Sequence, residues 1–305
     1  MTDTKRNVPG AIPIKTPDKT KIRISNFIIT AMLAFMAVMV LLPVIFIVAN
    51  SFMGSEEIMK SYSGLSGGIN LGNTKQLLPH IIPERSTLAQ YAEVFYNKPD
   101  YLVKFWNSVF LTLAIVIGQV VVSCFAGYGF AKFKFPLKNF IFFVFIVLMM
   151  MPFQVTLVPQ YIMLDRLGLI GSYFAIILPG ISAPFGIFLL TQVFSSIPDN
   201  IIEAANIDGA NSVQVLFRII FPYGKTGIAA LFILSFIDNW NMVEQPLVFL
   251  ADFRKYPLSI FLVNINMLNF GVAFVCGLLA MLPVVIVFLY LKDSLVYGIE
   301  TSNLK

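Results

Sequence analysis

Charged residues are scarce in this chain. Only 12% of its 305 residues are Asp, Glu, Lys or Arg, whereas 58% are hydrophobic. A soluble domain carries about 25% charged residues to cover its water-facing surface. The mean hydropathy of +0.83 points in the same direction. The composition therefore excludes an ordinary soluble protein and predicts a protein embedded in a membrane.

Cysteine and histidine are nearly absent as well. The two cysteines, Cys124 and Cys276, lie in apolar stretches, and His80 is the single histidine. These residues exclude a disulfide framework and form no cluster for zinc or haem. We therefore expect no metal site and no cofactor in this chain. Six of the 21 basic residues lie within the first 23 positions, which predicts membrane topology rather than nucleic-acid binding.

Six apolar stretches are each long enough to cross a bilayer, whose core of about 30 Å needs roughly 20 helical residues. Only the fifth contains acidic or basic residues in its interior, namely Asp238 and Glu244. Helices satisfy the backbone polar groups in lipid, and alternation with a period of two residues is absent. We predict an all-α integral membrane protein with six transmembrane helices. The predicted spans are Phe27–Asn50, Trp106–Ala131, Phe140–Met163, Ser172–Ser195, Thr226–Phe249 and Val272–Leu291.

Basic residues predict the orientation of these spans. One cluster precedes the first span, and Lys132, Lys134 and Lys138 lie between the second and the third. Because basic residues favour the cytoplasmic side, both termini are predicted to be cytoplasmic. The expected organisation is a cytoplasmic tail (1–25), a first span with a long external segment (26–104), a transmembrane core (105–298) with a cytoplasmic loop (198–222), and a short cytoplasmic tail (299–305).

Proline residues interrupt several of the predicted spans. Neighbouring helices can accommodate such residues as kinks. In the third span, Pro152-Phe153-Gln154 and Pro159-Gln160 have a second interpretation, in which the helix breaks beside a polar path. The two interpretations are compatible, and the sequence leaves both open.

The loop between the fourth and fifth spans has an informative pattern. Pro198 and Asp199 can begin a helix that good helix formers continue. Asp208-Gly209 then supplies a helix end at which a positive φ is needed. Asn211 or Ser212 can cap a second short helix that ends before Pro222. The sequence therefore predicts two short helices joined by a glycine bend on the cytoplasmic face.

This pattern resembles the coupling loop of bacterial ABC importer permeases. The matching residues are Glu203, Ala204, Ala205, Asp208, Gly209, Ala210, Phe217, Ile220 and Pro222. Further matches are Phe105, Asn107, Ser108, the run 126–131, Met151-Pro152, Pro159, Trp240-Asn241 and Pro246-Leu247. Over residues 86–298 the chain thus resembles carbohydrate-uptake permeases of the maltose-transporter type, specifically the branch of the second maltose-system permease.

The resemblance implies a type I ABC importer permease fold in the bacterial cytoplasmic membrane. The implied function is uptake of a sugar or oligosaccharide. The implied partners are a second homologous permease, two ABC ATPase subunits that hold ATP and magnesium, an external sugar-binding protein and membrane lipid. The chain itself is expected to be no enzyme and to bind no nucleic acid. Two alternatives are a permease for amino acids or peptides and an ion-coupled secondary transporter, although inverted repeats are not evident.

Polar residues in the fifth span suggest a substrate path. Ser235, Asp238, Asn241 and then Gln245 or Glu244 recur at helical spacing. Amide and carboxylate groups match sugar hydroxyls, and a ring such as that of Trp240 matches a pyranose face. Gln154 in the third span is a further candidate for this path. The alternative is a seam of hydrogen bonds between packed helices, and both interpretations stay open.

Overall fold

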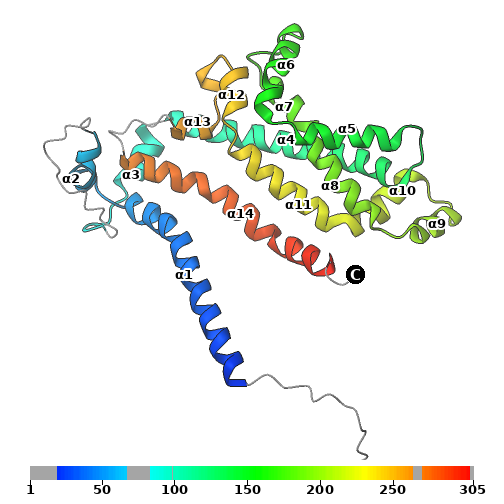
Figure 1. Cartoon of the computed structure of the whole chain (residues 1–305). Helices are drawn as coiled ribbons and strands as arrows, with labels where there is room; N and C mark the ends of the chain where they lie inside the picture. Colours follow the sequence, from blue (N-terminus) through cyan, green and yellow to red (C-terminus); the bar gives the residue numbers. More distant parts are fainter. Residues whose placement is uncertain (1–18, 67–82, 98, 264–269, 303–305) are drawn as a thin grey trace, which may run out of the picture.

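The computed structural model describes residues 19–66, 83–97, 99–263 and 270–302. In these ranges the regular structure is helical, and the only β-type pairing is an isolated bridge between Met53 and Ser86. The predicted all-helical class is therefore confirmed. Figure 1 shows a bundle of helices from which the first helix diverges.

The described residues form the following elements. The helices are α1 (Lys19–Ser51), α2 (Ser55–Ser66), α3 (Ala89–Ala92), α4 (Pro99–Lys132), α5 (Lys138–Met150), α6 (Phe153–Arg166), α7 (Phe174–Ile181), α8 (Pro184–Ser195), α9 (Asp199–Ile207), α10 (Ser212–Val215), α11 (Phe221–Trp240), α12 (Glu244–Phe249), α13 (Leu258–Val263) and α14 (Phe270–Ser302). Two π-helical turns, η1 (Glu93–Asn97) and η2 (Leu216–Ile220), and a 3₁₀ turn, η3 (Phe253–Lys255), complete the list.

Five helical segments of the described chain are long and apolar enough to cross a membrane. They are Asn26–Ser51, Asp100–Lys132, Phe174–Ser195, Ser212–Trp240 and Phe270–Asp293. A sixth span is obtained if the pair α5 and α6, which meet at 107°, is counted as one. These segments agree with the predicted spans one, two, four and six to within a few residues.

The third predicted span is broken at Pro152. α5 ends at Met150, Met151 is extended with ψ of 130°, and Pro152 precedes α6. Proline disfavours helical geometry in the residue before it, which explains why the helix ends here. Pro159, by contrast, lies inside α6. Of the two interpretations left open, the structure shows a break at Pro152 and a proline accommodated within the helix at Pro159.

The boundaries of the fifth predicted span were wrong at both ends. The helix begins at Ser212 rather than Thr226 and continues through Pro222 into α11, so the short second helix does not end before this proline. It stops at Trp240, and α12 follows after a break. Asn241 directly follows the last helical residue, and its side-chain amide donates to the carbonyl oxygen of Ile237 at 2.8 Å.

α4 is the central helix of the bundle and packs against α7, α8, α11 and α13. Glycine allows the close approach of α8, because a Cβ atom at Gly186 would clash with Ser123 Oγ and a Cβ at Gly127 would press on the backbone of Leu190. Small residues serve the same purpose in membrane helices generally, since lipid provides no hydrophobic drive for association. α4 therefore serves as the frame on which the remaining elements are placed.

The start of α4 is fastened to the segment that follows α12. The Asn107 side-chain amide donates to the carbonyl oxygens of Arg254 at 2.8 Å and Tyr256 at 3.2 Å. Ser108 Oγ accepts from the Leu258 backbone at 2.7 Å. These bonds satisfy backbone groups in an irregular segment and fix it against the bundle.

α1 is the least enclosed of the long helices. Its apolar segment is 0% buried within the described chain. The carboxyl end of α1 contacts α14, and the rest of α1 points away from the bundle (Figure 1). Its apolar side chains are exposed on every side between Asn26 and Leu42. A helix that is hydrophobic all round is covered by lipid or by another protein chain.

Candidate coupling loop and transport path

The predicted loop 198–222 begins with a well-defined short helix at one end of the bundle. Pro198 is extended and precedes α9, and Asp199 occupies the first turn. Its negative charge is favourable there because the amino end of a helix carries a partial positive charge. α9 and α10 lie together at the end of the bundle where α4 finishes and α5 starts (Figure 1).

α9 ends in the glycine bend that the sequence predicts. Gly209 has φ of +80°, and its backbone donates to Asn206 at 3.1 Å, while Ala210 donates to the Ala205 carbonyl at 2.9 Å. These two bonds form a Schellman motif, which satisfies the last carbonyls of the helix. Nothing lies within 4 Å of a Cβ atom built on Gly209, so the glycine is required for its backbone conformation and not for space within the chain.

The two faces of α9 have different chemistry. Ile202 and Ala205 pack on a core cluster formed largely by α4, α8 and η2. Glu203 and Ala204 are exposed on the outer face, and Ile207 is 86% exposed. The inner face holds α9 on the bundle, whereas the outer face combines acidic and apolar side chains that the chain leaves uncovered.

The second half of the loop is a capped helix with a π turn. Asn211 accepts from the Gln214 backbone at 2.8 Å, and the Gln214 side chain accepts from the Asn211 backbone at 2.9 Å, which makes a capping box. The helix widens at η2, where Phe221 donates to the carbonyl of Leu216. Proline has no backbone N–H, and the π turn directly before Pro222 keeps the helix continuous through it.

Two further residues that match the coupling loop, Phe217 and Ile220, lie in this π turn and differ in burial. Ile220 is 0% exposed and belongs to the core cluster. Phe217 is 51% exposed and has ring contacts with Phe221 at 5.0 Å and Phe125 at 6.4 Å. Phe217 therefore belongs to the outer surface of the loop, whereas Ile220 anchors the loop to the bundle.

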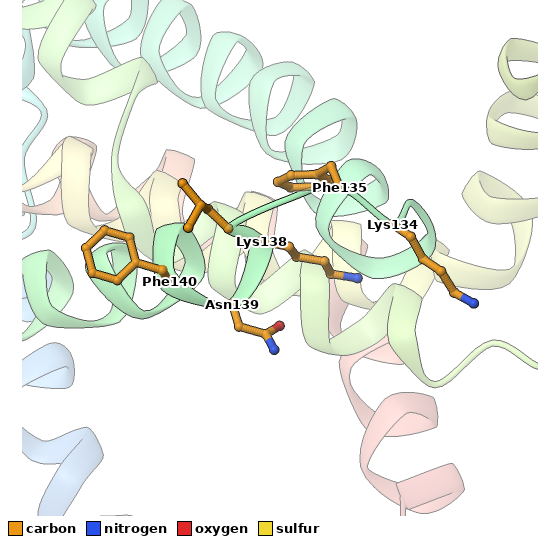
Figure 2. A pocket seen from close by; sticks show the side chains of 6 residues that line it. Lys134, Phe135, Lys138, Asn139 and Phe140 are labelled. Carbon is orange, nitrogen blue, oxygen red and sulfur yellow. The ribbon is translucent and has the colours of Figure 1, made fainter.

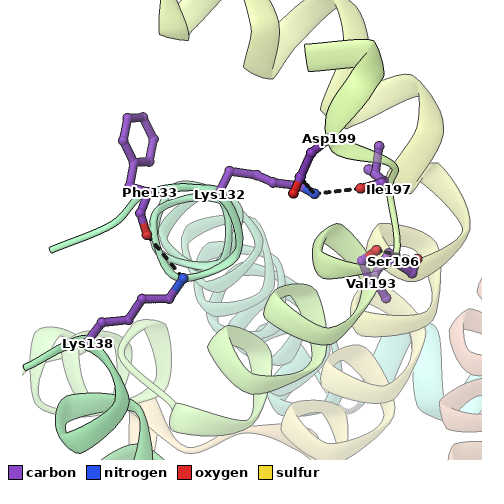
Figure 3. Close-up of polar contacts among 7 residues, drawn as sticks. All are labelled: Lys132, Phe133, Lys138, Val193, Ser196, Ile197 and Asp199. Carbon is purple, nitrogen blue, oxygen red and sulfur yellow. Dashed lines mark hydrogen bonds and ion pairs between the residues drawn. The ribbon is translucent and has the colours of Figure 1, made fainter. Parts of the chain in front are cut away.

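Lys132, the last residue of α4, ties the bundle to α9. Its ammonium group donates to Asp199 Oδ1 at 2.6 Å and to the carbonyl oxygen of Ile197 at 2.5 Å (Figure 3). The Lys132 side chain is 7% exposed and that of Asp199 is 76% exposed. The hydrogen bond from Lys132, reinforced by its charge, lowers the pKa of the Asp199 carboxyl group. The ion pair therefore fixes the turn that precedes α9.

The candidate path residues of the fifth span separate into two groups. Ser235 is buried and donates to Gln119 of α4. Trp240 is 5% exposed, donates from Nε1 to the Ala280 carbonyl at 3.1 Å and stacks on Phe236 with ring centroids 5.6 Å apart. Both side chains fit the packing-seam interpretation, because their polar groups are satisfied inside the chain.

The other candidates lie on the exposed side. Asp238 and Asn241 are exposed in this chain. Gln154 of α6 donates to both carboxylate oxygens of Glu244 in α12, at 3.0 and 3.2 Å. Gln245 is partly exposed. The structure thus brings Gln154 of α6 into contact with Glu244 of α12. Asp238 remains exposed on the surface of α11.

Sequence reasoning did not identify Lys132 as a partner of the loop or Gln119 as a partner of Ser235. In the sequence Lys132 indicates the orientation of the spans, and its position at the end of a span is the signal for an interfacial contact. The signal for Gln119 is its position in the middle of an apolar span, where a glutamine requires a hydrogen-bonding partner. The described residues contain no group of His, Cys, Asp or Glu side chains that could hold a metal ion.

Comparison with known proteins gives several matches. The chain is 28% identical to the arabinooligosaccharides transport system permease protein AraQ of Halalkalibacterium halodurans, over 92% of this chain and 97% of that protein. It is 35% identical to the sn-glycerol-3-phosphate transport system permease protein UgpE of Pectobacterium atrosepticum, over 51% of this chain and 56% of that protein. The similarity to AraQ therefore extends over nearly the full length of both chains, whereas that to UgpE covers about half of each.

Structure comparison supports the same fold. A chain of a bacterial ABC transporter involved in the import of the acidic polysaccharide alginate matches with a TM-score of 0.74 and 22% identity, over 92% of this chain and 99% of that chain. A family model described as binding-protein-dependent transport system inner membrane component matches residues 119–299, which include α9, the glycine bend and the exposed polar residues of α11. The chain belongs to this family of inner membrane transport components.

Proposed function

We propose that this chain is a membrane-spanning permease subunit of an ATP-binding-cassette importer that takes up a sugar or oligosaccharide. The observation that carries the proposal is the glycine-closed helix α9, whose outer face is exposed at the end of the bundle within the matched family region. The full-length similarity to an arabinooligosaccharide permease supports a carbohydrate substrate. The chain provides the passage and its gating, and chemical work is left to partner subunits.

The proposed partners are a second homologous permease, two ATPase subunits that bind ATP and magnesium, and an external solute-binding protein. The outer face of α9 and the exposed Phe217 offer acidic and apolar groups, so a groove with basic and apolar side chains on an ATPase would complement them. Extensive apolar surface on α1 supports a place in lipid or against the second permease.

The proposed orientation puts α9 and both termini in the cytoplasm. Lys132, Lys134 and Lys138 lie at the α4–α5 turn, and Lys132 contacts the turn before α9 directly. Basic residues near span ends favour the cytoplasmic side, and this contact supports the same side for the loop. The bacterial cytoplasmic membrane is the location that such an arrangement requires.

The proposed mechanism uses the loop as the mechanical input. ATP binding closes the two ATPases and displaces α9, and the two permeases then alternate between inward-facing and outward-facing forms around a shared path. Asp238, Asn241, Gln245 and the Gln154–Glu244 pair are proposed to line this path. Their carboxylate and amide groups can accept and donate hydrogen bonds to sugar hydroxyls. Ser235 and Trp240 are assigned to helix packing because they are buried.

An uptake experiment tests the proposal. Cells that lack the gene are complemented with the wild-type chain, and accumulation of radiolabelled arabinooligosaccharide, maltotriose, a dipeptide and an amino acid is measured. Uptake of a sugar that requires both the chain and cellular ATP is the expected result. Dependence of only the peptide or amino acid on the chain would favour the alternative permease class. Uptake that survives ATP depletion and is abolished by an uncoupler would favour an ion-coupled transporter.

A further inference from the structure

The turn between α4 and α5 forms a shallow cavity of about 410 Å³. Six consecutive or nearly consecutive residues line it, and Figure 2 shows their side chains. They are Lys134, Phe135, Leu137, Lys138, Asn139 and Phe140. The cavity is open to the surroundings rather than enclosed. The cavity is separate from the proposed transport path, which involves α6, α11 and α12.

The cavity carries positive charge. Asp199 forms an ion pair with the neighbouring Lys132 and also interacts electrostatically with Lys134 and Lys138, but no carboxylate of the described residues lies within ion-pair distance of these two lysines. Lys138 donates to the Phe133 carbonyl at 3.1 Å (Figure 3), which holds its ammonium group near the turn and leaves further N–H donors available. No acidic side chain lines the cavity, and none lies in the first turn of α5. The charge of the lining side chains therefore favours an anion over a cation.

Apolar side chains adjoin these lysines. Leu137 is 72% exposed, Phe140 is 63% exposed and Phe135 is 38% exposed. In Figure 2 the Lys134 and Lys138 side chains extend to the same side of the turn, whereas Phe140 extends to the other. A soluble anion gains nothing from exposed leucine and phenylalanine. An amphiphile with an anionic head and hydrocarbon chains matches both halves of this surface.

Leu137 is also conformationally unusual. Its φ is +60°, and it is the only non-glycine residue with a positive φ in the described part of the chain. A bulky residue seldom adopts this left-handed geometry, for which glycine or asparagine is better suited. Leucine at this position is disfavoured in water on two counts, backbone conformation and exposed apolar area. Insertion of its side chain among acyl chains would remove the second cost.

We propose that the α4–α5 turn binds the phosphate of an anionic phospholipid. The phosphate lies between the ammonium groups of Lys134 and Lys138, and the acyl chains run along Leu137 and Phe140. The inference rests on the proposed placement of this turn at the membrane surface. Anionic lipids attract basic segments at such surfaces, and basic pockets beside membrane helices bind their head groups.

Lipid binding to the purified full-length chain tests the inference. The chain is kept in neutral detergent, and affinities for phosphatidylglycerol and phosphatidylcholine are measured by native mass spectrometry. We expect phosphatidylglycerol to bind more tightly, and Lys134→Gln to lower its affinity about fivefold, as expected for about 1 kcal/mol per lysine. Lys225→Gln is the matched control, because this exposed lysine at the start of α11 does not line the cavity. It should leave the affinity unchanged.

A second variant separates a lipid from a free anion. Leu137→Asn tolerates the left-handed backbone but removes the apolar anchor. It should weaken phosphatidylglycerol binding. Inorganic phosphate, added as a competitor, should displace the lipid only weakly, and to the same extent in the variant and the wild type. Equal affinity for the two lipids, an equal effect of Lys134→Gln and Lys225→Gln, or displacement of the lipid by inorganic phosphate at equimolar concentration would each overturn the inference. Lipid binding is measured without transport, so failure of sugar uptake alone would refute the proposed function and not this site.

Discussion

The ammonium group of Lys132 joins Asp199 Oδ1, 2.6 Å away, to the carbonyl oxygen of Ile197, 2.5 Å away. Lys132 is the last residue of the central helix α4, and Asp199 is the first residue of α9. One side chain therefore links the frame of the bundle to both sides of the turn at which α9 begins. A displacement of α9 that keeps these bonds must also move the end of α4.

Replacement of Lys132 should weaken coupling more than replacement of Asp199. Lys132→Met leaves the Ile197 carbonyl without its donor, at a cost of about 1–3 kcal/mol where the group is buried. Asp199→Asn retains an oxygen that can accept from Lys132. Uptake and co-purification with the ATPase, measured for both variants at matched expression, should show the larger loss for Lys132→Met. The opposite order would mean that the Asp199 carboxylate contacts a partner rather than supporting the turn.

The Asp199–Lys132 pair should be insensitive to pH near neutrality. The folded-state pKa of Asp199 is lowered, so its contribution to stability is fully present above the unfolded-state value of about 4 and is lost as pH falls through the folded-state pKa. The difference in thermal midpoint between the wild type and Asp199→Asn should be constant between about pH 6 and pH 8 and shrink below about pH 4. If the difference in thermal midpoint changed between pH 6 and pH 8, another titratable group would be responsible for the pH dependence of stability.

Gly209→Val should disrupt the bend after α9. A β-branched residue at φ of +80° costs about 1–3 kcal/mol, although no atom of this chain would meet the new Cβ. The spans are unchanged, so the protein should still insert into the membrane. We expect loss of sugar uptake together with reduced co-purification of the ATPase. Normal transport by a well-expressed Gly209→Val chain would remove the basis for assigning loop 198–222 to coupling.

Gly209→Asn is the matched control for this backbone requirement. Asparagine adopts the left-handed conformation more readily than other residues with a side chain. Uptake should therefore be largely retained if the positive φ is what matters. An equal loss in Gly209→Asn and Gly209→Val would instead show that a partner approaches the Gly209 Cα too closely for any side chain.

Asp238→Leu should abolish uptake while the assembled complex remains intact. Asp238 is exposed, and no hydrogen bond of its carboxylate is found among the described residues, so its removal leaves no buried group of this chain unpaired. Asp238→Asn should retain uptake with an altered rate or selectivity. Ser235→Ala is the contrasting variant, because it removes the hydrogen bond to buried Gln119 and should destabilise the chain by about 1–3 kcal/mol. Loss of assembly in Asp238→Leu would place this carboxylate in a packing seam.

Cysteine labelling tests the proposed orientation. Cysteine at position 134 should be protected from an impermeant thiol reagent in intact cells and should react in inverted vesicles. Cysteine at position 85, an exposed site before α3, should show the reverse. The native Cys124 and Cys276 are 2% and 0% exposed, so they should contribute little background. Labelling of position 134 in intact cells would show that the orientation is the opposite of the proposed one.

Local signals predicted much of the fold. Apolar runs identified the spans, and Pro152 marked a kink or a break in the third because proline restricts the residue before it. The 107° angle at this break could not be predicted, since it depends on contacts such as the one between Gln154 and Glu244, which are 90 residues apart. The end of the fifth span was missed because the helix stops at Trp240, where no adjoining proline or glycine marks a boundary in the sequence.

The site shows the same division between local and long-range information. The positive φ of Gly209 follows from the local sequence, and this prediction is confirmed. The pairing of Asp199 with Lys132 rather than with Lys134 or Lys138 depends on how α4 packs against α8, and no local pattern distinguishes the three lysines. The burial of Trp240 likewise depends on α14, because Trp240 donates to the carbonyl oxygen of Ala280, which lies 40 residues further along the chain.

The helix from Ser212 to Trp240 has a mechanical consequence. Its 29 residues form a rod of about 43 Å, with the π turn at Leu216–Ile220 as the one departure from α-helical winding. A displacement applied beside the glycine bend reaches Asp238 through continuous helix, because the next break in the helix is at Asn241. Asp238 lies three residues before this break, so a rotation of the helix at the loop would also move this carboxylate.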